Sequence, residues 1–478
     1  MLKFLEDKLF LFRSCFSRKA TFNWFLLIIL ALMVRYDSLG VTSFIRALSL
    51  NGRFYESILH FFRSQAFDTM KLKNMWHKIV LTYAPFLRLN GRILLLGDGT
   101  KVPKEARRMP GVKKLYQESE DSSKPQFIHG HMFGGIGAVI GNLSKIFCIP
   151  LDLSLQDGLS GTASWRGGNP QNISSHVIQM IRNSHSLCQS FGQSCYCVLD
   201  RYFFTIPAFH ELIQLNGSSV HRLDLITRAK NNCVAYDFPN TSGKPQRGRP
   251  RKKGDAVKIS SLFSKCSEEF KKAQVTMYVE TENIEYLSLR KLWGKKLYQE
   301  VLFVLVKSDK KGNAIFVSTD LTLDPLLVVE AYAKRFNIEC MFRELKQQVA
   351  GFGYHFWTRS IPKLNKYKKK SDPDPLTGRN EKEQKRILLT IQAMERFVLC
   401  AEIAMGLVQL IALNPIFTKQ VESHRYLRTF QEGKVSEATV MEYLRKNIFR
   451  LLSLNPHSYI SRLILSRQKL DVEEKEAA

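Results

Sequence analysis

Three acidic residues stand where a metal-dependent active site could form. Asp98 ends one short apolar run within Gly-Asp-Gly-Thr, Asp200 ends another within Val-Leu-Asp-Arg, and Glu339 lies in the helix-like segment 325–348. Two aspartates at strand ends and one helix glutamate would supply the hard oxygen ligands that Mg²⁺ prefers, and would leave positions open for water and phosphate. Such a set suits two-metal phosphoryl transfer. We therefore expect these three residues to be catalytic and to bind the metal.

The segment 325–348 is predicted to be one continuous helix. Asp324 can accept a hydrogen bond as the capping residue, and the proline at 325 suits the first helical turn. At about 100° per residue, side chains at spacings of three, four and seven share one face of such a helix. The residues on this charged face are Tyr332, Arg335, Glu339 and Lys346. Arg335 and Lys346 are expected to hold DNA phosphates.

Glu344 competes with Glu339 for the catalytic position, because it too lies in a charged patch, beside Arg343. Five residues separate the two glutamates, which places Glu344 about 140° around the helix from Glu339. Glu339 is preferred for that reason. Taken alone, Asp98 could be an ordinary turn residue and Asp200 could cap a helix. Only their combination with the charged helix face favours catalysis.

The elements that must position these residues have an α/β pattern. The apolar runs before the two aspartates are predicted to be buried strands whose carboxylates emerge at the carboxyl edge of a sheet. Further strands are expected at 129–140 and 146–153, and a helix at 173–188. We therefore predict an α/β fold in which residues 89–230 form the first part of the catalytic core.

A different pattern separates the second aspartate from the glutamate. The segment 231–314 carries short β-branched and aromatic runs at 275–279 and 297–306, divided by polar turns. This pattern predicts a β-rich insertion within the core.

The remainder of the chain is predicted to be mostly helical. The second part of the core, 315–415, holds the charged helix, a basic loop that includes 368–370, and a long helix at 381–413. The C-terminal region, 416–478, contains a helical segment at 436–452.

The region 1–88 is predicted to be helical and to bind DNA. Thr42 or Ser43 could cap a short helix, a turn follows at Asn51-Gly52, and a second helix is expected at 53–63. This arrangement is compatible with a helix-turn-helix and equally with an ordinary helical hairpin.

The overall charge points to nucleic acid as the partner. The 478 residues carry 71 Lys and Arg against 43 Asp and Glu, a formal net charge of +28, which should attract polyanions. The nine cysteines are odd in number and lack the spacing of zinc ligands or disulfide pairs, which favours a reduced, cytoplasmic protein. The apolar stretch 24–34 has about half the length needed to cross a bilayer and is expected to be a buried helix.

The ordered motifs resemble those of a known family, the insertion-sequence-four group of DDE transposases. The signature of that group is Y-x2-R-x3-E-x6-K, and Tyr332, Arg335, Glu339 and Lys346 match its spacing without a gap. The flanks agree as well, with Gly-Asp-Gly-Thr after the first strand, Val-Leu-Asp-Arg after the later one, and Ser-Thr-Asp before the signature helix. The similarity covers roughly residues 40 to 360.

The resemblance implies an RNase H-like catalytic core interrupted by a β-domain, with helical N-terminal and C-terminal regions. It implies Mg²⁺ as the cofactor, with Mn²⁺ able to substitute. Tyr332, Arg335 and Lys346 take the role of contacting DNA phosphates near the transposon end. Some relatives cut the second strand through a hairpin that an aromatic residue of the insertion stabilises, and Trp293 is the candidate for that role here.

A basic stretch in the insertion, Arg-Gly-Arg-Pro-Arg-Lys-Lys-Gly at 247–254, resembles the extended arginine hook that enters the minor groove of A·T-rich DNA. Its candidate DNA-binding residues are Arg247, Arg249 and Arg251. The alternative interpretation is a solvated basic loop.

These observations predict a cytoplasmic DNA transposase that binds the inverted-repeat ends of its element, nicks them and joins the freed 3′-hydroxyls to target DNA. The partners expected are double-stranded DNA and a second copy of the chain, a homodimer in a synaptic complex, and no membrane. Two alternatives remain: a DNA-binding protein descended from such an enzyme but no longer catalytic, and an RNase H-like nuclease that cuts without joining. Convergence of the three carboxylates on one site would favour an enzyme.

Overall fold

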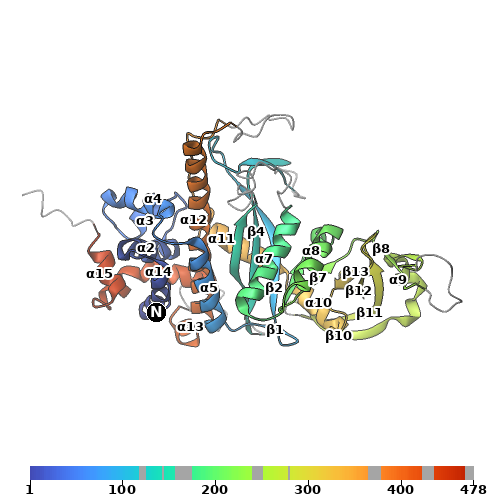
Figure 1. Cartoon of the computed structure of the whole chain (residues 1–478). Helices are drawn as coiled ribbons and strands as arrows, with labels where there is room; N and C mark the ends of the chain where they lie inside the picture. Colours follow the sequence, from blue (N-terminus) through green and yellow to red (C-terminus); the bar gives the residue numbers. More distant parts are fainter. Residues whose placement is uncertain are drawn as a thin grey trace, which may run out of the picture.

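The fold is described from a computed structural model. It describes residues 1–117, 125–142, 145–156, 175–239, 251–277, 280–363, 378–421 and 435–468. Over these residues the chain forms a mixed α/β structure around one central sheet, which confirms the predicted α/β class. The terminal helices gather on one side of this sheet and the strands that follow Asn231 extend it on the other (Figure 1).

The site is positioned by five strands of the sheet. They are β2 (Arg92–Pro103), β4 (Phe127–Asn142), β5 (Lys145–Leu155), β6 (Cys195–Leu199) and β7 (Leu223–Arg228), in the spatial order β5-β4-β2-β6-β7. Strand β4 is antiparallel to β2 and β5, whereas β6 is parallel to both β2 and β7. The carboxyl ends of β6 and β7 therefore lie at the same edge of the sheet. Short strands β1 (Arg88–Leu89) and β3 (Lys113–Tyr116) pair with β2 and β4.

The first aspartate is not at the end of its strand, so that prediction is wrong. Strand β2 continues five residues beyond Asp98, because β4 keeps pairing with it as far as Pro103 opposite Gly130. What ends near Asp98 is the parallel pairing with β6, whose last partners are Gly97 and Leu199. Asp98 therefore lies one residue past the parallel ladder, at the level where β6 has already ended.

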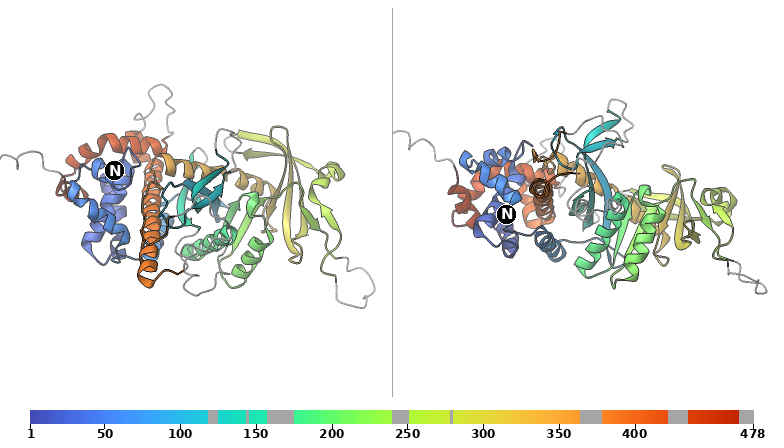
Figure 2. Two further views of the ribbon diagram at one scale, coloured as in Figure 1. Left: turned by 90° about the horizontal axis from the view of Figure 1, so that it is seen from above. Right: turned by 45° about the horizontal axis from the view of Figure 1, so that its top comes forward.

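Helices cover both faces of the core strands. The predicted helix at 173–188 is confirmed as α7 (His176–Phe191), which with α8 (Ile206–Gly217) packs on one face. On the other face lies α11 (Phe336–Gln347), the helix that carries Glu339. The turned views separate these two layers (Figure 2). Glycines let α11 approach, since a Cβ on Gly135 would stand 2.5 Å from the ring of Phe342.

The segment predicted as one continuous helix is broken in two. Helix α10 (Pro325–Ala333) ends at Ala333. The backbone N–H groups of Lys334 and Arg335 then bind the carbonyls three residues earlier, and α11 begins at Phe336. Side chains satisfy the carbonyls left at the break: Asn337 donates its amide to the Lys334 carbonyl at 2.9 Å, and Lys334 donates its ammonium to the Glu330 carbonyl at 3.2 Å. The capping role of Asp324 is confirmed, because its carboxylate accepts from the Leu326 N–H at 2.7 Å.

The residues between β7 and α10 are rich in strands. These strands are β8 (Val234–Tyr236), β9 (Ala256–Lys258), β10 (Lys271–Met277), β11 (Glu280–Trp293), β12 (Gln299–Ser308) and β13 (Gly312–Ser318), with a short helix α9 (Leu262–Lys265). The strands expected at 275–279 and 297–306 correspond to β10 and β12, although β11 and β13 were not foreseen. Strand β13 pairs with β7, so the added strands continue the core sheet rather than forming a separate one.

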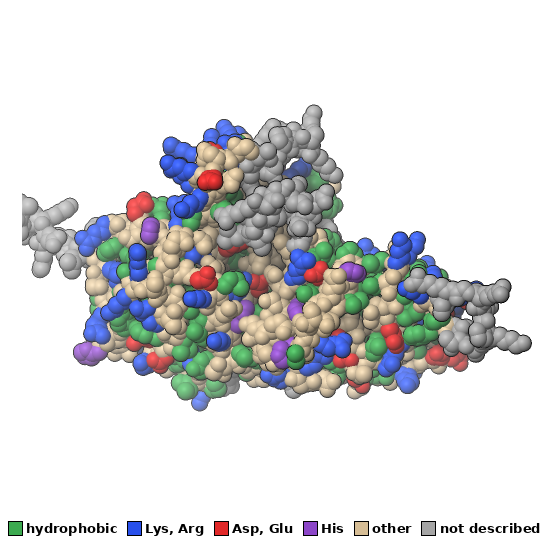
Figure 3. Space-filling model, viewed as in Figure 1, with side chains coloured by type: hydrophobic (Ala, Val, Ile, Leu, Met, Phe, Trp, Pro, Cys, Tyr) green, Lys and Arg blue, Asp and Glu red, His purple; other side chains and the backbone are tan. Residues whose placement is uncertain are grey.

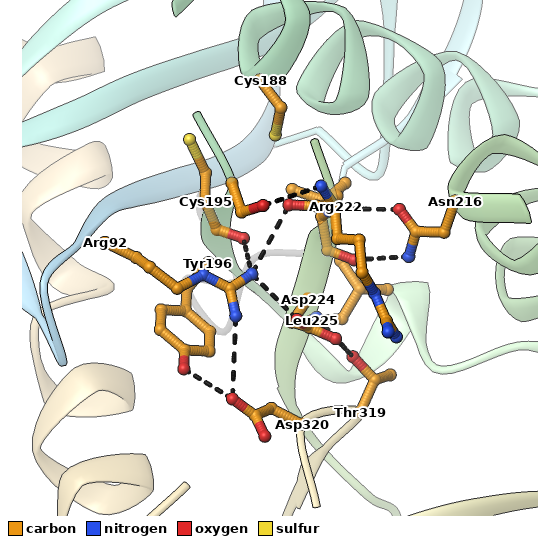
Figure 4. Close-up of polar contacts among 12 residues, drawn as sticks. Arg92, Cys188, Cys195, Tyr196, Asn216, Arg222, Asp224, Leu225, Thr319 and Asp320 are labelled. Carbon is orange, nitrogen blue, oxygen red and sulfur yellow. Dashed lines mark hydrogen bonds and ion pairs between the residues drawn. The ribbon is translucent and has the colours of Figure 1, made fainter. Parts of the chain in front are cut away.

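A buried network joins the start of the core strands to the segment after β13 (Figure 4). Arg92 donates to the Asp224 carboxylate at 2.8 Å and lies 3.7 Å from the carboxylate of Asp320, which also accepts from the Tyr196 hydroxyl at 2.6 Å. Although partial burial raises the pKa of Asp320, these hydrogen bonds and Arg92 hold it below its ordinary value. The network fixes the chain just before α10 begins.

The two ends of the chain build one helical lobe. Its helices are α1 (Leu2–Phe10), α2 (Lys19–Val34), α3 (Thr42–Ala47), α4 (Tyr55–Arg63), α5 (Thr69–Tyr83), α12 (Glu381–Leu413), α13 (Pro415–Val421), α14 (Glu437–Ser453) and α15 (Tyr459–Leu465). The helices predicted at 381–413 and 436–452 are confirmed, and so is burial of the apolar stretch 24–34 inside α2. Helix α12 is long and apolar enough to span a membrane, but 94% of that stretch is buried inside the protein.

The short helices at 42–63 form where expected, but not with the expected cap. Thr42 and Ser43 donate their hydroxyls back to the Leu39 and Gly40 carbonyls instead of capping α3. Helix α4 buries Ile58 and its phenylalanines against the lobe. Whether this pair of helices reads DNA stays a prediction.

The close approach of α11 to the sheet generates a first prediction. Gly135→Ala should lower the free energy of unfolding by about 1 to 3 kcal/mol, because the added methyl group must push the Phe342 ring away from the sheet. Gly217→Ala, at the end of α8 with no atom within 4 Å of the added carbon, should leave stability unchanged or slightly higher. Denaturant unfolding of both variants measures the difference, and equal stabilities would contradict this packing.

Candidate active site

One arginine joins two of the three predicted catalytic carboxylates. The Arg335 guanidinium donates from Nη1 to Asp98 Oδ2 at 2.9 Å and from Nη2 to Glu339 Oε1 at 2.6 Å. Asp98 comes from the middle of β2, whereas Arg335 and Glu339 come from the break after α10 and the first turn of α11. Asp98 and Glu339, which lie far apart in the sequence, therefore bind the same guanidinium.

The third carboxylate stands beside the first. Because Gly97 and Leu199 are partners in the parallel ladder, Asp98 and Asp200 follow at the next level of two adjacent strands. The Asp200 carbonyl accepts from the Thr227 hydroxyl at 3.1 Å, which ties the end of β6 to β7. Its carboxylate makes no capping bond to the short 3₁₀ turn that follows, so the capping alternative for Asp200 is not what the structure shows. Asp200 and Arg335 line the same hollow.

The electrostatics of the site follow from partial burial of like charges. Burial raises the pKa of Asp98, the charges of Asp200 and Glu339 raise it further, and Arg335 opposes both effects. Burial by itself would lower the pKa of Arg335, but Asp98 and the other nearby acids raise it above its ordinary value. The guanidinium therefore stays charged and partly neutralises a cluster of carboxylates that would otherwise repel one another.

The charged helix face has two further residues, Tyr332 and Lys346, and they contact different elements. Tyr332 lines the same hollow as Asp200, its ring stands 5.0 Å from that of Phe316 between centroids, and burial raises its pKa to about 12. Lys346 reaches back to β2 and donates to the Lys101 carbonyl at 3.2 Å. The helix break does not separate Tyr332 from Arg335, but it means that the shared face is not that of a single straight helix.

The competing glutamate has a different partner. Glu344 accepts from the Arg343 Nε at 3.0 Å, and its side chain is 13% exposed, whereas that of Glu339 is 43% exposed. Of the two glutamates, only Glu339 shares an arginine with Asp98. The geometry thus favours Glu339 over Glu344 as the third acid.

The donor set has the right chemistry for a divalent cation, although it is not a closed metal cluster. Among the residues that the structure describes, no group of three or more His, Cys, Asp and Glu side chains stands close enough to form one. Asp98 and Asp200 are nevertheless adjacent hard oxygen donors, and Glu339 lies one guanidinium away from Asp98. Carboxylates of this kind are the oxygen donors that Mg²⁺ and Mn²⁺ prefer, although the Arg335 guanidinium occupies the space between Asp98 and Glu339 in this structure.

Two cations near the acids were missed by the sequence analysis. Arg201 and Arg228 line the hollow that contains Asp200. Arg201 was visible as the residue after Asp200, but its side chain could equally have been solvated. Arg228 is the last residue of β7, and only the parallel pairing of β6 with β7 brings that strand end beside Asp200.

Trp293 does not lie open to solvent. It is 9% exposed, its ring stacks on Phe204 with centroids 3.9 Å apart, and Phe209 packs at 4.9 Å. The tryptophan thus joins the end of β11 to the segment before α8. With its ring packed in this cluster, Trp293 is not exposed to stack on a base, which argues against the hairpin role.

The basic hook is described only in part. Arg247 and Arg249 lie outside the described residues, as do the lysines at 368–370. Arg251 is exposed and lines a shallow basic hollow with Lys252, Lys253 and Lys296. The ammonium of Lys253 stands 3.8 Å above the ring of Tyr236.

Comparison with known families supports a DDE-type enzyme in broad terms. A family model described as DDE superfamily endonuclease matches residues 11–282, which is more than half of the chain. The matched residues include Asp98 and Asp200 and end before Glu339. No curated protein matches the chain.

The buried position of Trp293 generates the second prediction. Trp293→Ala should lower the free energy of unfolding by about 3 to 5 kcal/mol, because it removes the ring that Phe204 and Phe209 pack against. Trp357→Ala is the control, since that ring is 50% exposed and its loss should cost less than about 1 kcal/mol. Denaturant unfolding distinguishes the two, and equal losses would mean that Trp293 is not a core residue.

Proposed function

We propose a function from the premise that this chain belongs to the DDE superfamily of endonucleases. Members of this family are DNA-acting nucleases with an RNase H-like α/β core, and the sheet described above is of that mixed α/β kind. We propose more specifically that the chain is a DNA transposase of the insertion-sequence-four type, which nicks the ends of its element and joins the freed 3′-hydroxyls to target DNA.

The observation that carries the proposal is that the three acids are arranged around Arg335, two of them bound to its guanidinium and the third lining the same hollow. Asp98 and Asp200 are neighbours on parallel strands, and Arg335 brings Glu339 to Asp98 from a helix on one face of the sheet. Pairing with two carboxylates is not distinctive by itself, because the structural residue Arg92 also has two carboxylate partners. What distinguishes Arg335 is that it also lines an open hollow with Asp200, Arg201 and Arg228, which supplies room and cations for a phosphodiester.

Each residue of the site has a proposed role. Asp98, Asp200 and Glu339 hold Mg²⁺, or Mn²⁺ in its place. When bound, the metal would activate the attacking oxygen and stabilise the leaving oxygen of the phosphodiester. Arg335, Tyr332 and Lys346 bind and orient DNA phosphates around the acids, and Arg335 first has to exchange its carboxylate partners for phosphate.

The charge of the chain supports DNA as the substrate. The chain has a net charge of +28, and on the face drawn in Figure 3 Lys and Arg side chains gather at the free end of α12, whose first turns contain Lys382, Lys385 and Arg386. We propose that double-stranded DNA contacts these residues, the helical region 1–88 and Arg251 of the basic hook. A homodimer acting in the cytoplasm would let two element ends be processed together.

Substitution of the three acids tests the proposal. With DNA that carries the flanks of this gene, Asp98→Asn, Asp200→Asn and Glu339→Gln should each lower nicking and joining by more than about 100-fold while DNA binding persists. Glu344→Gln is the matched control and should stay active, because its partner is Arg343. Gel assays of nicked and joined products make the measurement, with Mg²⁺ removed by chelation as a second control.

Other outcomes would replace the proposal. Activity retained in Glu339→Gln but lost in Glu344→Gln would mean that Glu344, and not Glu339, is the third catalytic acid. Nicking without joining would make the chain a nuclease of the same superfamily. Binding of the ends by the wild type with no product at all would indicate a DNA-binding protein that has lost catalysis.

The position of Arg335 generates a further prediction on metal binding. In the absence of DNA, Arg335→Ala should raise the affinity for Ca²⁺, a cation used here to follow binding, by about tenfold, because Asp98 and Glu339 lose the charge that competes with it. Arg343→Ala is the matched control on the same helix and should change nothing, since its partner is Glu344. Isothermal titration calorimetry measures both affinities. Weaker binding by Arg335→Ala would mean that the guanidinium arranges the carboxylates rather than competing for them.

A further inference from the structure

A basic cleft leads away from the acidic site along the edge of the sheet. The first hollow, of about 390 Å³, contains Asp200 and Arg335. The second, of about 480 Å³, contains Lys230. Arg201 and Arg228 line both hollows, so the two hollows adjoin and together make up the basic cleft. Each is many times larger than the roughly 10–15 Å³ that a cavity needs in order to hold one water molecule.

The cations of this cleft differ from Arg92 and Arg335 in having no acidic partner among the described residues. Arg92 and Arg335 each form ion pairs with two carboxylates. Within the described part of the chain, Arg201, Arg228 and Lys230 form no such pair. Asp200 is the sole acid that lines the two hollows there, at the end nearest the catalytic site. A cleft with unpaired positive charge along its length attracts a polyanion.

The scaffold holds Arg228 in place. It is the last residue of β7, a strand paired on one side with β6 and on the other with β13, where Arg228 is opposite Phe316. The neighbouring Thr227 donates to the Asp200 carbonyl at 3.1 Å. Arg228 also lines a third hollow, with Tyr332 and Lys311. Arg228 therefore lines all three hollows, and the paired strand β7 keeps it close to Asp200.

We propose that Arg201, Arg228 and Lys230 bind successive phosphates of the DNA strand that leaves the acidic site over the carboxyl end of β7. Asn231 and Asn232, which line the second hollow, can add neutral hydrogen-bond donors from their side-chain amides. The cleft makes no distinction among bases, so it secures DNA beside the scissile phosphate without reading its sequence. This inference rests on the proposed function, because it assumes that DNA is the substrate.

Arg228→Ala tests the proposal through the salt dependence of binding. Loss of one phosphate contact should weaken duplex binding by about tenfold and lower the slope of log affinity against log salt by about 0.9. The double variant Arg228→Ala with Lys230→Ala should lower the slope by about twice as much. Fluorescence anisotropy with a labelled duplex carrying the gene flanks, without divalent metal, measures both quantities.

Two variants serve as controls. Arg222→Ala removes an exposed arginine just before the opposite end of β7, outside both hollows, and should leave affinity and slope unchanged. Arg228→Lys keeps the charge and should keep the slope. If Arg228→Lys lost binding as fully as Arg228→Ala, the role of the residue would be structural and the proposal would be wrong.

The outcomes separate this inference from the proposed function. Wild-type slope and affinity in Arg228→Ala, from a protein that still nicks DNA, would overturn the inference alone. A loss of affinity with an unchanged slope would also overturn it, because a phosphate contact must release counterions. Failure of the wild-type protein to bind any duplex would overturn both the inference and the proposed function.

Discussion

The ion pairs of Arg335 with Asp98 and Glu339 are the constraint on which the site depends. A guanidinium can donate to two carboxylates at once only if the strand and the helix that carry them come within one side chain of each other. That proximity requires glycines in β4, where any side chain would meet α11. It also requires the break between α10 and α11, because Arg335 lies in the tight turn at the start of α11. Partial burial makes the pairing costly to disrupt, since removal of one partner leaves the others without compensation.

The same helix is held at its other end by the helical lobe. Arg35, buried at the end of α2, donates to the Val349 and Ala350 carbonyls at 2.7 Å, and Arg445 of α14 donates to the Gln348 carbonyl at 2.9 Å. Cations at the carboxyl end of a helix are stabilised by its dipole and satisfy carbonyls that lack an intrahelical partner. Burial lowers the pKa of Arg35 to about 10, so it remains charged at neutral pH. Residues from both ends of the chain thereby fix the helix that carries Glu339.

The arginines of the molecule divide according to what they contact. Arg35 binds backbone carbonyls and Arg92 binds carboxylates, and both are held inside the fold. Arg335 also binds carboxylates, but those of the candidate site, and it faces an open hollow. Arg228 lines the same hollow and has no acidic partner among the described residues. Arg228 therefore leaves positive charge available to a polyanion beside the three acids.

The sequence by itself determined the α/β class, the buried strands before the two aspartates, the long helices of the lobe and the identity of the charged residues, because these depend on local periodicity and residue type. It could not show that β2 runs on past Asp98, since that depends on how far β4 stays paired with it. Nor could it show the break before α11, which side-chain bonds of Lys334 and Asn337 stabilise without any proline or glycine to mark it. Trp293 was indistinguishable from an exposed aromatic residue until Phe204 packed against it. Arg228 belongs to the site only because β6 and β7 pair in parallel, which brings their carboxyl ends together. The number of residues between Asp200 and Arg228 does not predict that pairing.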